Sequence, residues 1–239
     1  MIDDGYELTF RSPKNQSLPI IEYDESSFAH AILFASETKS EYHRYSKELL
    51  FHYLKLISNI YFLLTGFASD ITPQSLVSLL NLKSNLIIAL STKQNILSSL
   101  ASEFSLILPP PGTPLISYFP KRNEPASLIP ISPSSQDKAS KILSKDLSPV
   151  WFSGIPLSLG NIPFLVPILH APPESFAAEV DGGSADAIVD AADRGGEGLW
   201  AGSQLSVVTG FQALNGARVT WVGGVDIFSD ELAQKEVSK

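Results

Sequence analysis

Short apolar runs and amphipathic segments alternate over the first half of the chain. Residues 31–35 (AILFA) and 86–90 (LIIAL) are continuous apolar runs, which are typical of strands covered on both faces. Apolar residues at helical spacing predict two helices, one over 72–83 that begins at Thr72-Pro73 and one over 96–104. The apolar positions of these helices are Leu76, Val77, Leu79, Leu80, Ile96, Leu97, Leu100, Ala101 and Phe104. This order of elements predicts an α/β fold with a mostly parallel sheet flanked by helices.

Two features before residue 72 stand apart from this pattern. A strand pattern at 6–10 begins almost at the first residue, which indicates that the natural start of the domain is missing. Residues 49–64 are strongly apolar, but His52 and Lys55 interrupt the run. It is also shorter than the roughly 20 apolar residues that a membrane span requires. We therefore expect a peripheral or buried helix there.

Prolines dominate the middle of the chain and exclude long regular elements from Pro109 onward. Residues 137–147 are the part of this region that predicts a short helix. Pro167 lies within the apolar run 164–170, which is expected to form an edge strand or an extended wall because proline cannot donate within a ladder. Residues 181–198 are acidic and rich in Gly and Ala, and they predict a flexible loop.

A β-hairpin is the clearest prediction near the C-terminus. Alternating apolar residues at 205–211 and 217–221 flank Asn215-Gly216, a pair that favours a hairpin turn because both residues tolerate positive φ. Ser229 then suits a helix N-cap, since the two residues after it are acidic and favourable to the helix dipole. The fold class predicted from the pattern is therefore α/β with a C-terminal β-hairpin and proline-rich connections.

Composition narrows the function classes. The 239 residues carry 17 Lys plus Arg against 25 Asp plus Glu, a formal net charge of −8, which argues against a nucleic-acid partner because such a surface needs a basic footprint. The chain has no cysteine, which excludes disulfides, zinc–thiolate sites and cysteine nucleophiles. The first residues lack the basic and apolar regions of a secretory signal peptide.

Asp226 is the sharpest candidate for chemistry, because it follows a predicted strand and the pair Gly223-Gly224. It could orient a substrate or bind a cation beyond the carboxyl end of that strand. Alternatively, it is a structural corner that bonds nearby backbone amides. The structural interpretation is favoured, since no second carboxylate or histidine lies near it in the sequence.

No other stretch nominates a catalytic, cofactor-binding or metal-binding residue. Residues 195–198 (GGEG) look like a phosphate loop, but they follow an acidic stretch and lack the lysine of a P-loop. Of the four histidines, only His43 and His52 lie on a plausible helix together, and they are nine residues apart. The prediction is therefore no catalytic residue, no cofactor and no metal.

Two further features concern glycans. Asn15-Gln16-Ser17 fits the acceptor pattern for N-glycosylation, so Asn15 is a candidate modification site if the protein enters the secretory pathway. Trp151, Trp200 and Trp221 are candidate sugar-stacking faces, although Trp221 lies in a strand pattern and is expected to pack in the core.

Several stretches together resemble a known family, the non-catalytic 48-kDa-type subunit of eukaryotic oligosaccharyltransferase in its fungal form. The resemblance covers most of residues 5–39 and 67–239 and is weakest through the proline-rich middle. The stretches that carry it are GYELTF (5–10), AILFA (31–35), FLVPILHAPPESF (164–176) and WAGSQLSVVTGFQALNGARVTWVGGVDIFSD (200–230).

This resemblance implies a function as well as a fold. The family belongs to the endoplasmic reticulum membrane complex that transfers a preassembled glycan from dolichyl diphosphate to the Asn of Asn-X-Ser/Thr. The catalytic centre lies in another subunit, so the expected partners are the other subunits, including the catalytic one. The luminal domain of the family is similar to class I glutamine amidotransferase-like, flavodoxin-like proteins without their cysteine nucleophile.

The resemblance also indicates what this chain lacks. Residues 1–239 are expected to be a single luminal α/β domain that is N-terminally incomplete. Membrane association is expected only through a missing C-terminal helix and through partner subunits. Residues 40–66 have no counterpart in the family and are expected to be an insertion of foreign sequence, such as a retained intron.

Two other functions stay open on the sequence. One is a soluble α/β hydrolase or amidotransferase-like enzyme that uses Asp226 near the carboxyl edge of the sheet. The other is a carbohydrate-binding module that uses the tryptophans.

Overall fold

The computed structural model describes residues 8–11, 20–23, 25–26, 28–34, 60–64, 72–92, 96–133, 148–177, 200–233 and 235. Asn15, the predicted helix at 137–147 and the predicted loop at 181–198 lie outside the described residues. Of the predicted insertion at 40–66, only residues 60–64 are described.

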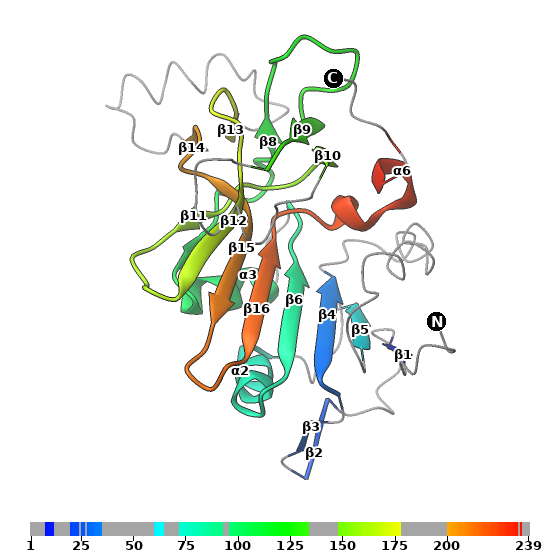
Figure 1. Cartoon of the computed structure of the whole chain (residues 1–239), viewed down its shortest axis with the longest axis vertical. Helices are drawn as coiled ribbons and strands as arrows, with labels where there is room; N and C mark the ends of the chain where they lie inside the picture. Colours follow the sequence, from blue (N-terminus) through cyan, green and yellow to red (C-terminus); the bar gives the residue numbers. More distant parts are fainter. Residues whose placement is uncertain are drawn as a thin grey trace.

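A seven-stranded sheet forms the centre of the described structure (Figure 1). Neighbouring strands run parallel from the first edge of this sheet through its fifth strand, and the last two strands run antiparallel to their neighbours. In spatial order the strands are β1 (Leu8–Arg11), β5 (Ile60–Leu64), β4 (His30–Phe34), β6 (Asn85–Ala89), β16 (Arg218–Val222), β15 (Ser206–Gln212) and β12 (Leu165–His170).

The two predicted apolar runs form adjacent strands near the middle of this sheet. β4 and β6 pair in parallel register from His30 beside Asn85 to Phe34 beside Ala89. Leu33 in β4 and Ile88 in β6 are completely buried. Because both faces of these strands are covered, the sequence shows continuous apolar runs instead of alternation.

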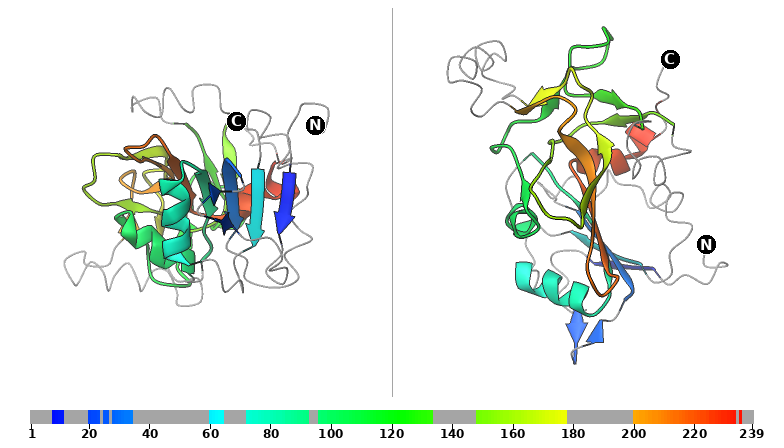
Figure 2. Two further views of the ribbon diagram at one scale, coloured as in Figure 1. Left: turned by 90° about the horizontal axis from the view of Figure 1, so that it is seen from below. Right: turned by 60° about the vertical axis from the view of Figure 1, so that its left-hand side comes forward.

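Helices α2 (Pro73–Asn81) and α3 (Ile96–Glu103) lie on the same side of the central sheet, as Figure 2 shows. α2 begins where the sequence predicts. Its N-cap Thr72 accepts a hydrogen bond from the Ser75 N–H, and the Ser75 hydroxyl accepts one from the Thr72 N–H, which closes a capping box. The buried face of α2 is the predicted one except for Val77, which is 39% exposed because it lies at the margin of the apolar stripe.

Aromatic packing joins α3 to the sheet. Phe104, directly after α3, meets Phe211 edge to face with ring centroids 5.0 Å apart, and its ring lies 5.6 Å from that of Trp221. Trp221 is completely buried, and its indole Nε1 has no hydrogen-bond acceptor among the described residues. The prediction that Trp221 packs in the core is therefore confirmed.

Short antiparallel sheets make up most of the remaining described structure. β8 (Leu115–Ile116), β13 (Phe176–Ala177) and β14 (Trp200–Ala201) form one, and β9 (Ile129–Ile131) pairs with β10 (Val150–Phe152). β7 (Leu106–Ile107) pairs with β11 (Ser158–Leu159), and β2 (Ile21–Glu22) pairs with β3 (Glu25–Ser26). The chain then forms a 3-10 helix, η3 (Val225–Phe228), and the short helix α6 (Asp230–Ala233).

The predicted fold class is wrong. We expected a mostly parallel sheet flanked by helices, of the class I glutamine amidotransferase-like, flavodoxin-like type. The described residues are mostly β: the central sheet is mixed, the other four sheets are antiparallel, and α2 and α3 are the only described α-helices longer than four residues. Prolines explain part of the difference, because they divide residues 109–133 and 148–173 into short strands where a parallel fold would place crossover helices. No described helix is both long and apolar enough to cross a membrane.

The helix expected over 49–64 is also wrong for the part that is described. Residues 60–64 (IYFLL) form β5, which pairs in parallel with β1 on one side and with β4 on the other. A short apolar run of this kind does not distinguish a buried strand from a helix segment. β5 lies inside the range 40–66, whose foreign origin stays a prediction.

The hairpin between β15 and β16 is confirmed, with a longer turn than the two-residue type. The Ala213 N–H donates to the Ala217 carbonyl at 2.8 Å, so the loop contains three residues, of which Gly216 has a φ of +89°. The Asn215 amide donates to the Leu80 carbonyl at 2.7 Å at the end of α2, and its Oδ1 accepts from the Ala217 N–H. The asparagine thus joins the hairpin to the helix.

The edge-strand prediction for 164–170 is confirmed as well. β12 forms one edge of the central sheet, and its pairing with β15 shifts register between Pro167 and Leu169. The proline therefore lies where the ladder is already interrupted.

A histidine–asparagine pair joins the starts of β4 and β6. The Asn85 amide nitrogen lies 3.2 Å from His30 Nδ1, and Asn85 Oδ1 accepts a hydrogen bond from the Arg218 N–H at 2.9 Å. This second bond directs the amide N–H of Asn85 toward His30, so Nδ1 is the acceptor in the neutral ring. Burial lowers the pKa of His30 below its ordinary value.

We predict that His30 makes stability fall as the pH falls. Because the pKa is lower in the folded state, the unfolded chain takes up a proton first, and stability is lost from about pH 6.5 down to the folded pKa. The free energy of unfolding, measured with urea between pH 7.5 and 5, should show this slope. His30→Gln should flatten it; an unchanged slope in that variant would contradict the assignment.

Candidate functional site

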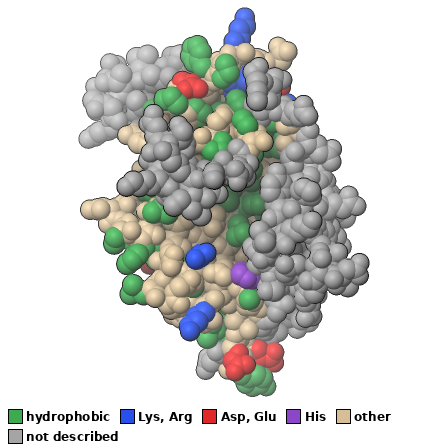
Figure 3. Space-filling model, in the orientation of Figure 1, with side chains coloured by type: hydrophobic (Ala, Val, Ile, Leu, Met, Phe, Trp, Pro, Cys, Tyr) green, Lys and Arg blue, Asp and Glu red, His purple; other side chains and the backbone are tan. Residues whose placement is uncertain are grey.

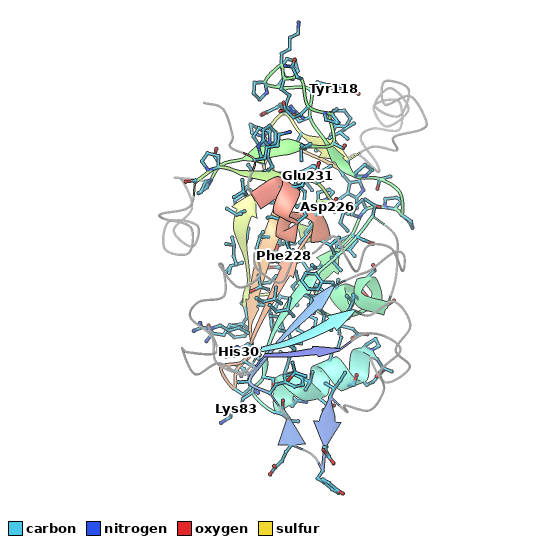
Figure 4. The ribbon with its side chains drawn as sticks, turned by 90° about the vertical axis from the view of Figure 1, so that its right-hand side faces the viewer. His30, Lys83, Tyr118, Asp226, Phe228 and Glu231 are labelled. Atoms are coloured by element: carbon cyan, nitrogen blue, oxygen red, sulfur yellow. The ribbon has the colours of Figure 1, made fainter. Side chains whose placement is uncertain are left out.

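The carboxyl edge of the parallel strands is the first place to look for a site, because open α/β sheets bind their ligands there. In this chain η3 packs against part of this edge. Phe228 of η3 meets Phe34, the last residue of β4, edge to face with ring centroids 5.5 Å apart. Figure 4 shows Asp226, Phe228 and Glu231 at this end of the sheet, whereas His30 and Lys83 lie at the opposite end.

The chain directly after β16 packs against the backbone of residues 153–155. The Ile155 N–H donates to the Gly223 carbonyl at 2.8 Å, and the Gly223 N–H donates to the Val207 carbonyl at 2.9 Å. A Cβ on Gly223 or Gly224 would lie closer than 3.0 Å to backbone atoms of residues 153–155. The two glycines therefore allow two chain segments to pack in direct backbone contact.

Asp226 lies in this region as the second residue of η3. It is half-buried, and its backbone carbonyl accepts a hydrogen bond from the Ser229 N–H at 2.9 Å, which closes the turn. Ser229 in turn caps α6, since its hydroxyl accepts from the Leu232 N–H at 3.4 Å as the sequence predicts. Within the described ranges, no group of three or more His, Asp or Glu side chains could hold a metal ion.

The described histidines lie on strands of the central sheet, whereas Asp226 lies on η3. His30 lies at the start of β4, and His170 lies at the end of β12, where its Nδ1 donates to the Ser203 carbonyl at 2.8 Å. His30 thus lies at the end of the sheet away from Asp226 (Figure 4), and the Nδ1 of His170 is paired with a backbone carbonyl and not with the carboxylate that hydrolysis by a catalytic triad would require.

Two of the three tryptophans have no open face for a sugar to stack on. Trp151 is 6% exposed and Trp221 is completely buried. Trp200 is half-buried and packs against the hydrophobic core. Stacking of a sugar requires an exposed ring face, so the described structure does not support the carbohydrate-binding alternative through Trp151 or Trp221.

A loop with an unusual set of hydrogen bonds lies between two of the small antiparallel sheets. We call residues 117–128, which connect β8 to β9, the aromatic loop; it forms the upper tip of the molecule in Figure 1. Arg122 holds this loop from inside with six hydrogen bonds to backbone carbonyls, three of them at 2.7, 3.0 and 3.1 Å. The acceptors are the carbonyl oxygens of Ser117, Phe119, Pro120, Pro125, Ala126 and Leu128.

A residue near the C-terminus fastens the same loop to β10. Lys235 Nζ lies 3.2 Å from Glu124 Oε1 and 5.0 Å from the centre of the Trp151 ring. The Glu124 carboxylate accepts a hydrogen bond from its own backbone N–H and a second one from Lys235, and these two contacts, in this order, lower its pKa. The aromatic loop is thus held both from inside and from one side.

Two large aromatic side chains project from this fixed loop. Tyr118 is 55% exposed and Phe119 is 64% exposed, while the Tyr118 ring lies 6.2 Å from that of Phe176 in β13. Figure 3 shows hydrophobic side chains gathered at this end of the molecule, with a basic side chain projecting beyond them. Exposed aromatic side chains on a fixed loop are typical of recognition surfaces.

We predict that Arg122→Ala loosens this loop. The guanidinium donates hydrogen bonds to several carbonyl groups around it. Its loss should therefore lower the free energy of unfolding by about 2 kcal/mol, the scale of hydrogen bonds to a charged group. Amide exchange in residues 117–128 should rise, while exchange in the central sheet should not change. Arg122→Lys should rescue little, because an ammonium group cannot reproduce the planar fork. Full rescue by lysine would contradict the prediction.

Sequence reasoning missed the aromatic loop. It registered the prolines of this region and expected little structure. The signal that could have found it is an arginine within a short proline-bounded segment that also carries two adjacent aromatic residues, Tyr118 and Phe119. The set of carbonyls around Arg122 depends on the loop conformation and could not be read from the residue order.

Comparison with known proteins adds one finding. Residues 62–239 match the model of the family described as OST48, N-terminal domain. No curated protein matches the chain.

Proposed function

The chain belongs to the OST48 N-terminal domain family, that of a subunit of the oligosaccharyltransferase complex, and from this we propose that it is a non-catalytic subunit of that complex. The match over residues 62–239 carries the proposal. It agrees with the resemblance predicted over 67–239, whereas residues 5–39 lie outside the matched range.

The non-catalytic role is supported by the geometry of the carboxyl edge. Gly223 and Gly224 are in backbone contact with residues 153–155, and Phe228 of η3 packs against the end of β4. A catalytic site would need an accessible pocket with convergent polar groups at this edge. On this proposal, Asp226 is a structural corner, and the glycan is transferred by another subunit.

The proposal has three further parts. The protein acts on the luminal side of the endoplasmic reticulum membrane, with the other subunits, including the catalytic one, as its partners. The reaction served is transfer of a preassembled glycan from dolichyl diphosphate to the Asn of Asn-X-Ser/Thr. Of the insertion expected over 40–66, residues 62–66 lie within the match to the family, so an insertion of foreign sequence is proposed for residues 40–61. Sequencing of transcripts across this region would test it, and abundant messages that encode it would contradict it.

A substitution at Asp226 tests the non-catalytic role. In cells that contain only the Asp226→Asn variant, occupancy of N-glycosylation sites should equal that of the wild type, because the carboxylate has no chemical step to perform. The measurement is mass spectrometry of glycopeptides, with the variant present at wild-type abundance. A marked fall in occupancy at equal abundance would contradict the proposal, and depletion of the whole protein is the positive control.

A further inference from the structure

We propose that the aromatic loop is the contact through which this protein docks into an apolar pocket with an acidic rim on another subunit of the complex. The inference rests on the proposed function, and it adds the surface and the chemistry of the partner. Tyr118 and Phe119 are the anchors, and Lys121 supplies the charge.

The first reason is that the loop is fixed before it binds. Arg122 bonds to six carbonyls of the loop, and the contacts of Lys235 with Glu124 and Trp151 hold its flank. An exposed loop without such bonds would lose conformational entropy on docking, and that loss weakens binding. Because the loop already holds Tyr118 and Phe119 in position, docking loses less conformational entropy.

The second reason is the composition and shape of the tip. Tyr118, Phe119 and Pro120 are all exposed and consecutive, and the loop that carries them forms one tip of the molecule (Figure 1). Aromatic residues dominate the centres of protein interfaces, where they enter desolvated pockets of the partner. A projecting anchor requires a concave partner surface, so the complementary site is an apolar pocket.

The positive charge of Lys121 indicates that the rim of the partner's pocket is acidic. Lys121 is exposed, and among the described residues it pairs with no acidic side chain. Glu124, the acidic residue within the loop, is already paired with Lys235. A cation that has no acidic partner among the described residues, placed beside two aromatic anchors, is complemented by a carboxylate on the rim of the partner's pocket.

A lipid surface fits these observations less well. The exposed apolar part of the loop is small, consisting of Tyr118, Phe119, Pro120 and Pro125, and Lys121 is the cation beside it that has no acidic partner among the described residues. Stable attachment to a bilayer requires a larger apolar face or a cluster of basic residues. Contact with lipid is therefore an outcome that the test must be able to detect.

Site-specific photo-crosslinking tests the proposal in the intact complex. A benzophenone amino acid is placed at Phe119 in the full chain, expressed in cells whose oligosaccharyltransferase is intact, and membranes are irradiated. We expect a light-dependent adduct with one other subunit. The matched control carries the same probe at Leu214, which is 91% exposed on the hairpin loop at the other end, and should give no such adduct.

A binding measurement accompanies the crosslinking. Tyr118→Ala and Phe119→Ala together should weaken association with that subunit at least about tenfold, the scale of interface anchors. The melting temperature of the variant should stay close to that of the wild type because both side chains are exposed. No adduct, an adduct with lipid alone, equal adducts from both positions, or unchanged association of the double variant would overturn the proposal.

The failure of this inference can be distinguished from failure of the proposed function. If the wild-type chain does not associate with the complex at all, the proposed function is wrong. If the wild type associates and the double variant associates equally well, the function stands and the aromatic loop is not the contact.

Discussion

Gly224→Ala, at a buried position, is expected to destabilise the protein more than alanine substitution of a glycine at an exposed turn. A Cβ at this position would lie closer than 3.0 Å to the Ser153 carbonyl oxygen, which is backbone and cannot move as a side-chain tip could. The two segments would have to separate, and their hydrogen bond from the Ile155 N–H to the Gly223 carbonyl would be strained. We expect a loss of about 3 kcal/mol or more, measured by urea unfolding.

Gly216→Ala is the matched control. Gly216 has a φ of +89°, but a Cβ there meets nothing within 4 Å, so only the backbone conformation opposes the substitution. The expected loss is about 1 kcal/mol. If the two substitutions cost the same, the backbone contact at the exit of β16 is not as tight as the structure shows.

Trp221→Ala is the second substitution with a large expected effect. The side chain is completely buried against Phe104 and between the hydrophobic strands β6 and β15. Truncation would leave a large cavity under α3, and the expected loss is about 3–5 kcal/mol. Thermal unfolding should show a fall in melting temperature of roughly 6–20 °C for a chain of this size.

Trp221→Phe separates packing from hydrogen bonding. Because the Trp221 Nε1 has no acceptor among the described residues, removal of the indole N–H sacrifices no hydrogen bond with them. The phenyl ring preserves much of the buried volume, so the variant should recover at least half of the stability lost in Trp221→Ala. A phenylalanine variant as unstable as the alanine variant would show that the indole N–H makes an essential bond.

The sequence predicted correctly those elements that depend on residues close together in the chain. Thr72-Pro73 begins α2 through a capping box of adjacent residues, and Asn215-Gly216 turns the hairpin through the φ of Gly216. Both depend on residues within four positions of each other, so the residue order contains the necessary information.

Predictions that depended on distant contacts were less successful. Residues 60–64 become a strand because β1 and β4 provide ladder partners on both sides, and nothing in the local pattern distinguishes this from a helix. The overall fold class was wrong for a similar reason. Two strand–helix units suggested a regular parallel sheet, whereas antiparallel additions from the C-terminal hairpin and β12 made the sheet mixed.

The candidate site was only partly predictable. The sequence pointed to Asp226, and the structure places it on η3, shortly after the backbone contact of Gly223 and Gly224. It did not point to the aromatic loop, because the carbonyl groups that surround Arg122 converge only when the loop has folded.

Association with the other subunits is the most direct test of the function proposed here. The full-length protein, tagged and expressed at its natural level, is purified from endoplasmic reticulum membranes after solubilisation in mild detergent, and its partners are quantified by mass spectrometry. Membership of the complex predicts that the other oligosaccharyltransferase subunits, including the catalytic one, are recovered in near-equal molar amounts. Recovery of the protein alone, or with an unrelated set of partners, would contradict the function proposed for this chain.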